Sequence, residues 1–404
     1  MRIFVADGAE RHSVDIPDQS RIGSGGAGVI YRILDARYSG TVAKIYHQAA
    51  QCERTKIQAM LDAPPDGLLI RINDRQVPVL SWPTHLLEND QGQAIGYLMP
   101  YVDISLAVPL NTYIEDIESL SEQDQSISLR IVVARNLTAA LAALHEKRDY
   151  FIDLKPQNIL VFRESGNICL LDCDGFAIDG GRYPAHQYSS QYMAPEILIN
   201  RVEPQALSLN DYQDRFALAV IIFQILNYST HPFQGILLDQ SIEDANTDEI
   251  LKRGWYAYGI NPCQHISPVR TSIHEYWDTG TRQLFDRTFT AKRPSHRPSA
   301  VEWREHLDSL IQNKAFIKCN RFPSEVTHIH FKDKSCFVCE KFTVVVEPKP
   351  VPSPTPSPQH PNLLQQKQSS SVTSALKVIA KIAGGLIIAF VIVAGIAIIV
   401  SAIQ

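Results

Sequence analysis

The stretch from Ile382 to Gln404 carries no charged side chain, and this constrains the chain more than any other single feature. At about 1.5 Å rise per residue, a helix over residues 382–403 reaches roughly 33 Å, which is enough to cross the hydrocarbon core of a bilayer. A buried core helix is the alternative, but one of this length ordinarily has a polar face. We therefore expect a transmembrane helix over residues 378–403.

The residues around this helix predict its orientation. Lys377 and Lys381 flank its N-terminal end, as expected on a cytoplasmic side. The N-terminus lacks the long apolar run and small-residue cleavage site of a signal peptide. We expect a tail-anchored membrane protein with a cytoplasmic head. Gly385 and Ala389 form a small-xxx-small pair that could support a homodimer, although chance in an Ala/Gly-rich segment explains it equally well.

A Pro/Ser/Gln-rich linker, residues 346–375, precedes the predicted membrane helix. Seven of the 24 prolines lie between Pro348 and Pro361, which favours extended polyproline II structure. At about 3.1 Å per residue, such a spacer could hold the head up to roughly 90 Å from the bilayer. A PxxP ligand is the alternative interpretation.

Composition and charge exclude several classes of protein. A hydrophobic content of 45% excludes disorder of the whole chain, and the sequence is neither collagen-like nor a disulfide-dense mini-protein. With 38 basic and 43 acidic residues the net charge is −5, which gives no general attraction to nucleic acid. We expect no nucleic-acid partner.

Three of the seven cysteines cluster near two histidines, and the others are scattered as in proteins of a reducing compartment. The clustered residues are Cys319, His328, His330, Cys336 and Cys339. One Cys, one His and a C-x-x-C pair can supply four tetrahedral zinc ligands, and a closed site of this kind is structural. In H-I-H both histidines lie on one side of a strand, so the sequence does not choose between them. We expect a zinc-knuckle-like element over residues 314–345; redox-inert thiols in a small β element are the alternative.

A glycine-rich segment lies near the N-terminus, where Gly23, Gly25 and Gly28 spell G-x-G-x-x-G. Glycines let the backbone approach phosphate oxygens closely. Dinucleotide-binding folds share this pattern but continue into a helix. Here β-type residues follow, then a glycine hairpin and a strand that contains Lys44.

The segment from Asp153 to Asn158 reads D-L-K-P-Q-N, the catalytic-loop signature of eukaryotic-like (Hanks-type) Ser/Thr protein kinases. Further matches to that family follow in order. They are Asp172 at the end of an apolar strand, Ala194-Pro195-Glu196, Asp214-Arg215-Phe216-Ala217-Leu218, His231-Pro232-Phe233 and Arg297-Pro298-Ser299. The resemblance covers roughly residues 15–312. It is closest to a bacterial subgroup with a C-terminal Cys/His knuckle and a membrane anchor.

The resemblance implies an α+β, two-lobed protein-kinase fold, with an antiparallel β N-lobe over residues 1–101 and a mainly helical C-lobe over 102–313. The knuckle, linker and membrane helix would follow. It also implies ATP and Mg²⁺ (or Mn²⁺) as cofactors and proteins as substrates.

The family's functional roles carry over to matching positions in this sequence. Asp153 would accept the substrate hydroxyl proton, Lys155 would neutralise the transferring phosphoryl group, and Asn158 and Asp172 would hold the metal. Asp174, in the tempting D-G-F, comes two residues too late for the metal ligand. Asp214 would support the catalytic-loop backbone, and Glu196 and Arg297 would form a structural ion pair.

Lys44 lies in V-A-K-I-Y, which resembles the third kinase strand, and would bind the α- and β-phosphates of ATP. Glu53 is the acidic residue of the helix-like stretch that follows and is expected to pair with Lys44, although it comes only nine positions later. Four apolar residues are candidates for contact with adenine, and each is equally well explained as core. They are Ile22, Ile30, Ala43 and Leu160.

Two departures from the family pattern stand close to the catalytic residues. Phe151-Ile152-Asp153 replaces H-R-D, and the missing arginine predicts an enzyme that needs no phosphorylation of its activation segment, residues 172–196. Asp172-Cys173-Asp174 replaces D-F-G, which stiffens the segment or adds a carboxylate near the metal site. All the phosphoryl-transfer residues remain.

We therefore expect a membrane-tethered, ATP-dependent Ser/Thr protein kinase, located in the inner membrane if the host is bacterial. A catalytically weak or inactive pseudokinase scaffold at the membrane is the alternative. A zinc-ribbon nucleic-acid binder has little support, because residues 314–345 lack a dense basic stripe with interleaved aromatics.

Overall fold

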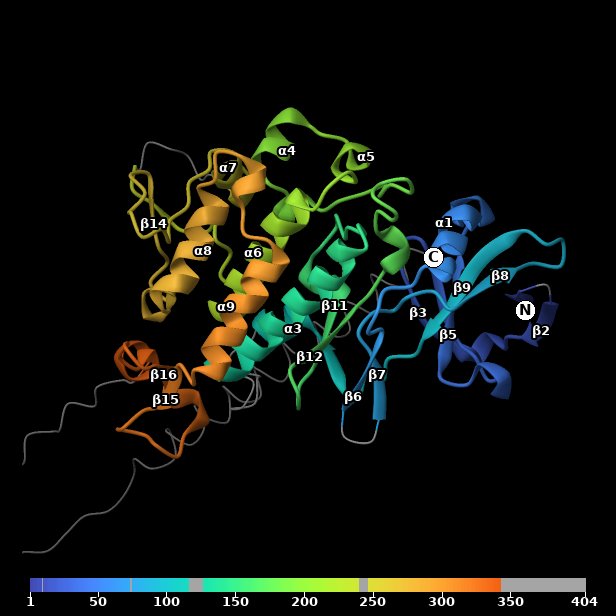
Figure 1. The fold of residues 1–404 in the computed structure, drawn as a ribbon, viewed down its shortest axis with the longest axis horizontal. Helices are drawn as coiled ribbons and strands as arrows, with labels where there is room; N and C mark the ends of the chain where they lie inside the picture. The colour runs from blue at the N-terminus through green and yellow to red at the C-terminus, as the bar shows by residue number, and fades with distance from the viewer. Residues whose placement is uncertain (9, 73–74, 116–125, 240–245, 343–404) are drawn as a thin grey trace, which may run out of the picture. The chain divides into compact units, whose positions relative to one another are not determined.

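The computed structural model describes residues 1–8, 10–72, 75–115, 126–239 and 246–342 (Figure 1). They belong to one compact unit that extends from Met1 to Val344. The predicted linker (346–375) and the predicted membrane helix (378–403) lie outside the described residues.

A seven-stranded antiparallel sheet forms the N-lobe, with strand order β2-β1-β8-β9-β5-β4-β3 (blue to cyan in Figure 1). Its strands are β1 (Arg2–Asp7), β2 (Glu10–Asp15), β3 (Arg21–Ser24), β4 (Gly28–Arg32), β5 (Thr41–Tyr46), β8 (His85–Glu88) and β9 (Ala94–Pro100). A hairpin of β6 (Leu69–Ile72) and β7 (Arg75–Pro78) and one helix, α1 (Arg54–Asp62), complete the lobe.

Two glycines bring the central strands of this sheet together. A Cβ at Gly28 would collide with the carbonyl oxygen of Ile45, and one at Gly96 with that of Lys44. By contrast, a Cβ at Gly25 or Gly26 would meet no atom within 4 Å. Gly28 is therefore explained by strand packing, whereas the neighbouring turn is open on its surface.

The C-lobe is mainly helical. Its helices are α2 (Leu110–Glu115), α3 (Ile127–Glu146), α4 (Pro195–Asn200), α5 (Pro204–Leu207), α6 (Tyr212–Leu226), α7 (Thr247–Lys252), α8 (Thr279–Phe289) and α9 (Ala300–Gln312). A sheet of β10 (Ala107–Pro109), β11 (Ile159–Phe162) and β12 (Asn167–Leu170) and a two-stranded pair, β13 (Ile236–Leu237) and β14 (Ile266–Ser267), accompany them. This is the two-lobed α+β fold that the sequence predicts.

Helices α3 and α6 form the centre of the C-lobe, and α3 packs against both α6 and α9 (Figure 1). Among the described residues, α3 is the one helix long and apolar enough to cross a membrane. Most of it is buried inside the lobe, as expected for the core helix of a globular domain. Helix α6 is apolar on nearly all sides and is enclosed by aromatic rings, with Phe223 in contact with Trp277 and Phe285.

The element after α9 packs on the C-lobe. Strands β15 (Phe316–Lys318) and β16 (Ile329–Phe331) form an antiparallel pair, and a π-helical turn follows at Val338–Phe342. Phe331 and Phe337 are buried in the same core as α3 and α6. This segment is therefore an extension of the kinase core.

Candidate active site and Cys/His cluster

Asp214, a fully buried residue of α6, holds the backbone of the predicted catalytic loop just before Asp153. Its two carboxylate oxygens accept the backbone N–H groups of Phe151, at 2.7 Å, and Ile152, at 2.8 Å. His145, at the end of α3, lies 3.1 Å from the same carboxylate. Asp214 thus has the contacts that the sequence predicts for it.

Asp153 and Lys155 lie side by side in this loop. Lys155 Nζ donates to Asp153 Oδ2 at 2.6 Å and to the hydroxyl of Ser189 at 3.0 Å. The other oxygen, Asp153 Oδ1, is buried and has no hydrogen-bond partner among the described residues. A buried, unpartnered carboxylate oxygen is costly, so this oxygen is available to a donor from water or a bound molecule.

Asn158 and Asp172 are the two residues whose oxygens would hold a magnesium ion. Asn158 Nδ2 donates to the carbonyl oxygen of Asp153 at 3.3 Å, so its amide oxygen is not used in that bond. The backbone N–H of Leu171 donates to the carbonyl of Asn158 at 2.8 Å, which ties the two segments together. The Asp172 side chain is 60% exposed. A carboxylate and an amide oxygen are the hard ligands that Mg²⁺ prefers, and these residues fit it.

Lys44 lies in a nearly buried cluster of acidic and phenolic groups. Its Nζ donates to both oxygens of Asp174, at 2.7 and 2.9 Å, and to Asp172 Oδ1 at 3.0 Å. Tyr46 and Tyr97 also donate to Asp174, each at 2.6 Å. Burial would lower the pKa of Lys44, but the two carboxylates outweigh it and the pKa is raised. Burial would raise the pKa of Asp174, but Lys44 and the hydroxyl donors lower it.

The predicted pair between Lys44 and Glu53 is not the arrangement in this structure. Glu53 is the N-cap residue of α1, and its Oε1 lies 2.8 Å from Nε2 of His186 in the activation segment. The side chain of Glu53 is 41% exposed. The physical reason is position: Glu53 precedes the first residue of α1 and pairs with His186, whereas Asp174 already bonds to Lys44.

The sequence analysis does not predict Asp174 as a partner of Lys44, and it does not predict that Tyr46 and Tyr97 belong to this cluster. A signal for both tyrosines was present. Tyr46 follows Lys44 by two residues in β5, so the two side chains share a face of the sheet. Tyr97 is the direct cross-strand neighbour of Lys44 in β9.

The four candidate adenine contacts lie in different surroundings. Ala43 is packed in the N-lobe core, and Leu160 belongs to a separate small cluster with Val77 and Cys169. Ile22 is 51% exposed, and Ile30 is half-buried in β4. At the turn between β3 and β4, the N–H of Gly25 donates to the carbonyl of Gly28 at 2.9 Å, which closes the glycine-rich segment into a hairpin. These contacts with ATP remain predictions.

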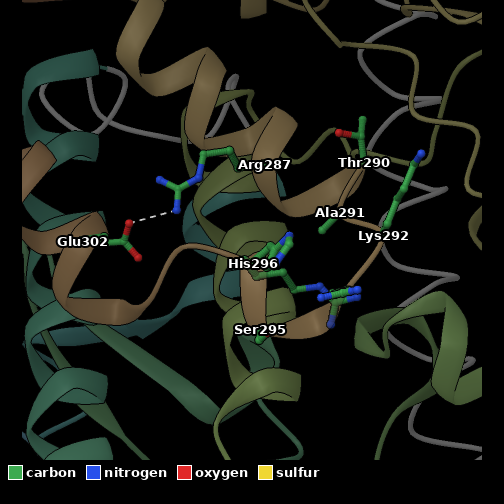
Figure 2. Close-up of a pocket in the computed structure, with 9 residues that line it drawn as sticks. Arg287, Thr290, Ala291, Lys292, Ser295, His296 and Glu302 are labelled. Atoms are coloured by element: carbon green, nitrogen blue, oxygen red, sulfur yellow. Dashed lines mark hydrogen bonds and ion pairs between the residues drawn. The ribbon is translucent and has the colours of Figure 1, made fainter.

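Arg297 and Glu196 form the ion pair that the sequence predicts, with Arg297 Nη2 2.8 Å from the carboxylate. Arg297 also borders a pocket of about 690 Å³ between the end of α8 and the start of α9 (Figure 2). Arg287 and Glu302 pair across one side of this pocket at 2.9 Å. None of the predicted ATP-binding or catalytic residues lines it, so it is separate from the candidate active site.

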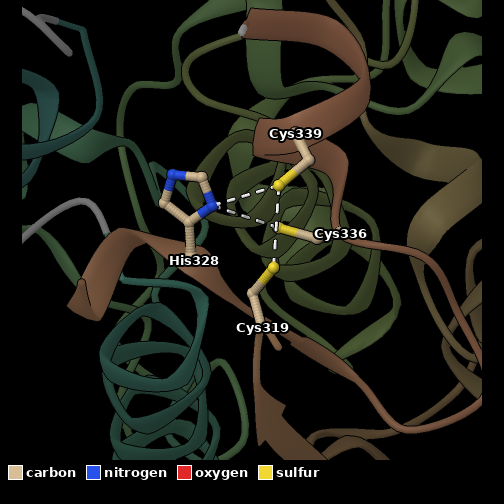
Figure 3. Close-up of side chains that lie close together, drawn as sticks. All are labelled: Cys319, His328, Cys336 and Cys339. Atoms are coloured by element: carbon tan, nitrogen blue, oxygen red, sulfur yellow. Dashed lines mark hydrogen bonds between the residues drawn. The ribbon is translucent and has the colours of Figure 1, made fainter. Parts of the chain in front are cut away.

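Four of the five predicted zinc ligands converge at one point: Cys319, His328, Cys336 and Cys339 (Figure 3). Their ligand atoms all lie within 4.8 Å of one another. His330 is not among them, because its Nδ1 lies 2.9 Å from the carbonyl oxygen of Phe331. The structure therefore separates the two histidines that the sequence left equivalent.

The spacing of this cluster fits a tetrahedral ion. Cys319 Sγ lies 3.6 Å from Cys339 Sγ, and His328 Nδ1 lies 3.4 Å from Cys339 Sγ. Four ligands at about 2.3 Å from a zinc ion would be separated by about 3.8 Å. A disulfide needs about 2.0 Å, so these thiols are free. His328 Nε2 lies 3.1 Å from Glu325, a carboxylate that would orient the ring as a ligand.

Comparison with known proteins agrees with this geometry. The model of the protein kinase domain matches residues 87–307, a span that begins after the glycine-rich strands and Lys44. The chain is 26% identical over 300 residues to Protein kinase YegI of Escherichia coli K12, and equally to that of strain O157:H7. These alignments cover 72% of this chain and 44% of each relative, so the chain spans less than half the length of the curated proteins it matches. The resemblance to a bacterial Hanks-type kinase is confirmed, and the chain belongs to the protein kinase family.

Proposed function

We propose that this protein is an ATP-dependent Ser/Thr protein kinase that uses Asp153 as the catalytic base. The observation that supports this most is the unpartnered oxygen of Asp153. It is buried, and the neighbouring Lys155 occupies the other oxygen. A substrate hydroxyl is the donor that would fill this position.

In the proposed reaction, a serine or threonine hydroxyl donates its proton to Asp153 Oδ1 while its oxygen attacks the γ-phosphorus of ATP. The bond from that phosphorus to the β–γ bridging oxygen breaks, and ADP leaves with the bond's electron pair. Lys155 stands within hydrogen-bond distance of the base and neutralises charge on the transferring group. Lys44 binds the α- and β-phosphates.

Asn158 and Asp172 would hold Mg²⁺ (or Mn²⁺), which when bound offsets the negative charge of the phosphates. The exposed Asp172 carboxylate is free to turn towards a cation, because within the described part of the chain Lys44 bonds to one of its oxygens, at 3.0 Å. The fixed loop beneath Asp153 supports positioning of the base, since phosphoryl transfer depends mainly on orientation and charge stabilisation.

The test is transfer of labelled phosphate from ATP to a generic protein substrate by the full chain in detergent with Mg²⁺. We expect phosphoserine and phosphothreonine in the product, and loss of transfer in Asp153→Asn. Stabilisation by ATP without any transfer would instead favour a pseudokinase scaffold. Exclusive phosphotyrosine would contradict the Ser/Thr assignment.

We propose two further properties of the chain. Residues 378–403 anchor it in a bilayer with the kinase on the cytoplasmic side, supported by the charge-free segment and its flanking lysines. Membrane fractionation of the full chain and of a chain ending at residue 345 tests this, and equal solubility would contradict it.

The second property is a structural zinc ion held by Cys319, His328, Cys336 and Cys339. Support comes from the mutual spacing of the four ligand atoms. Metal analysis of the purified protein should give about one zinc per chain. A metal-free, fully folded protein would overturn it.

A further inference from the structure

We propose that Asp174 is the positioning residue that holds Lys44 ready for the phosphates of ATP, in place of a carboxylate from helix α1. This rests on the proposed function, in which Lys44 binds the nucleotide. Asp174 stands where the family pattern has the glycine of D-F-G, and the resemblance gives that position no such task.

Asp174 is held more completely than any other acidic group near the site. Lys44 Nζ donates to both of its oxygens, and Tyr46 and Tyr97 donate one hydrogen bond each, all within 2.9 Å. Its side chain is only 9% exposed. A carboxylate with these four hydrogen bonds has no room to reorient, so it fixes the direction of the lysine.

Asp172 and Asp174 therefore divide two tasks. Asp172 makes one bond of 3.0 Å to Lys44 and is largely exposed, which suits a ligand that must turn towards a metal. Asp174 is enclosed by the protein and remains with the lysine. When Asp172 engages a metal, Lys44 keeps its second carboxylate and the buried charge stays paired.

Helix α1 is occupied elsewhere. Glu53 pairs with His186, and Lys56 Nζ donates to the carbonyl of Pro184 at 3.3 Å. The buried side chains of α1 are Lys56, Ile57 and Met60, and none of them is acidic. The helix is thus bonded to the activation segment and presents no carboxylate to β5.

One three-residue segment, 172–174, supplies both the predicted metal ligand Asp172 and the carboxylate that holds Lys44. The ion pair of Lys44 is therefore complete without an inward shift of α1. The activation segment sets the position of the lysine directly.

The experiment measures the amine of Lys44 in the full chain without substrate. A small amine-directed sulfonyl fluoride labels the protein at one fixed pH, and mass spectrometry reads the rate of labelling at Lys44. Because Asp174 holds the amine inside the buried cluster with two hydrogen bonds, Asp174→Asn should release it and raise the labelling rate by about threefold or more. Asp174→Glu, which keeps both acceptor oxygens, should restore the slower wild-type rate at least in part.

Glu53→Gln is the matched control and should leave the labelling rate unchanged. The same proteins are titrated with Mg²⁺ and a non-hydrolysable ATP analogue. We expect the dissociation constant to rise about tenfold or more in Asp174→Asn and to stay within about twofold in Glu53→Gln. Equal effects of the two variants, or no change in Asp174→Asn, would overturn the proposal.

Two further measurements cover a variant that does not fold and a protein that does not bind nucleotide. If Asp174→Asn does not fold, Tyr97→Phe removes one hydroxyl from Asp174 without changing charge or volume, and it should weaken the analogue by about twofold to tenfold. An unchanged dissociation constant in a folded Tyr97→Phe would then count against Asp174. If the wild-type protein binds no nucleotide, the proposed function fails, but the labelling rate of Lys44 still decides whether Asp174 holds it.

Discussion

Asp214 Oδ1 accepts the backbone N–H of Ile152 at 2.8 Å. Ile152 has a φ of 59°, in the left-handed region that β-branched residues avoid. Holding such a residue there costs on the order of 1–3 kcal/mol and requires fixed surroundings. The buried carboxylate provides them, and the strained residue directly precedes Asp153.

Asp214→Asn should therefore lower both stability and activity. The amide has one acceptor oxygen where the carboxylate has two, so one of the loop N–H groups would lose its partner. We expect the free energy of unfolding to fall by about 2–3 kcal/mol, with a lower kcat. Denaturant titration and steady-state kinetics measure this. Asp308→Asn, which removes the charge from a partly exposed pair with Arg135, should cost less than about 1 kcal/mol. If the two variants behave alike, Asp214 does not have this role.

Asp153→Asn should separate chemistry from binding. The amide keeps the shape of the side chain but cannot accept a proton from the substrate hydroxyl, so kcat should fall by about 10²–10⁴. The dissociation constant for the ATP analogue and the free energy of unfolding should change little. Asp179→Asn, an exposed residue paired with Arg182, is the control and should keep full activity. Retention of most activity in Asp153→Asn would contradict its role as base.

The fold could be predicted from short motifs because their spacing reflects contacts that the backbone must make. Asp214 and the Arg297–Glu196 pair are examples, since each joins segments that lie far apart in the sequence. The predicted boundary at residues 313–314, between the C-lobe and the Cys/His element, does not separate two hydrophobic cores. Phe331 and Phe337 are buried in the C-lobe core, and the sequence offers no pattern that would reveal this long-range packing.

The partner of Lys44 could not be predicted from motif spacing alone. Glu53 is the predicted partner because it is the acidic residue of the helix-like stretch after Lys44, but α1 begins only at Arg54, so Glu53 precedes the helix. Asp174 comes two residues too late for the metal ligand, and motif spacing assigns it no other role. The information that favours Asp174 is three-dimensional: β5 and β9 place Lys44, Tyr46 and Tyr97 around one point, and the segment after β12 brings a carboxylate to it.

His231 should make the protein sensitive to acid. Its Nδ1 accepts the N–H of Phe233 at 3.2 Å and its Nε2 lies 3.1 Å from the carbonyl of Gln191, so the neutral ring satisfies both. Burial lowers the pKa of His231 to about 4. Since the folded-state pKa lies below the unfolded value of about 6.5, its contribution is complete above that pH and is lost as the pH falls towards 4.

The expected size of this effect is about 3 kcal/mol between pH 6.5 and 4. His231→Gln removes the titrating group, so the difference in the free energy of unfolding between about pH 7 and about pH 4.5 should shrink by about 2–3 kcal/mol. Other groups titrate equally in both proteins. His296→Gln changes an exposed histidine and should leave the difference unaltered. An unaltered difference in His231→Gln would contradict the assignment.

Removal of the proposed zinc ion should destabilise the whole kinase, because the Cys/His element shares the C-lobe core. Phe337 lies 6.1 Å from the ring of Tyr228, and Arg130 of α3 stacks on that ring at 4.1 Å. Tyr276 donates to Glu340 at 2.7 Å. Loss of the metal would loosen this layer, and we expect a strong chelator to lower the single melting transition of the full chain by several degrees, about 2–4 °C for each kcal/mol lost.

The two histidines provide a matched pair for this prediction. His328→Ala should lower zinc content and melting temperature together, and chelator should have no further effect on it. His330→Ala, two residues away in the same element, should bind zinc and respond to chelator as the wild-type protein does. Re-addition of zinc should restore the wild-type melting temperature but not that of His328→Ala. Equal zinc content in the two variants would remove His328 from the ligand set, and a second, separate transition on chelation would show that the element unfolds without the C-lobe.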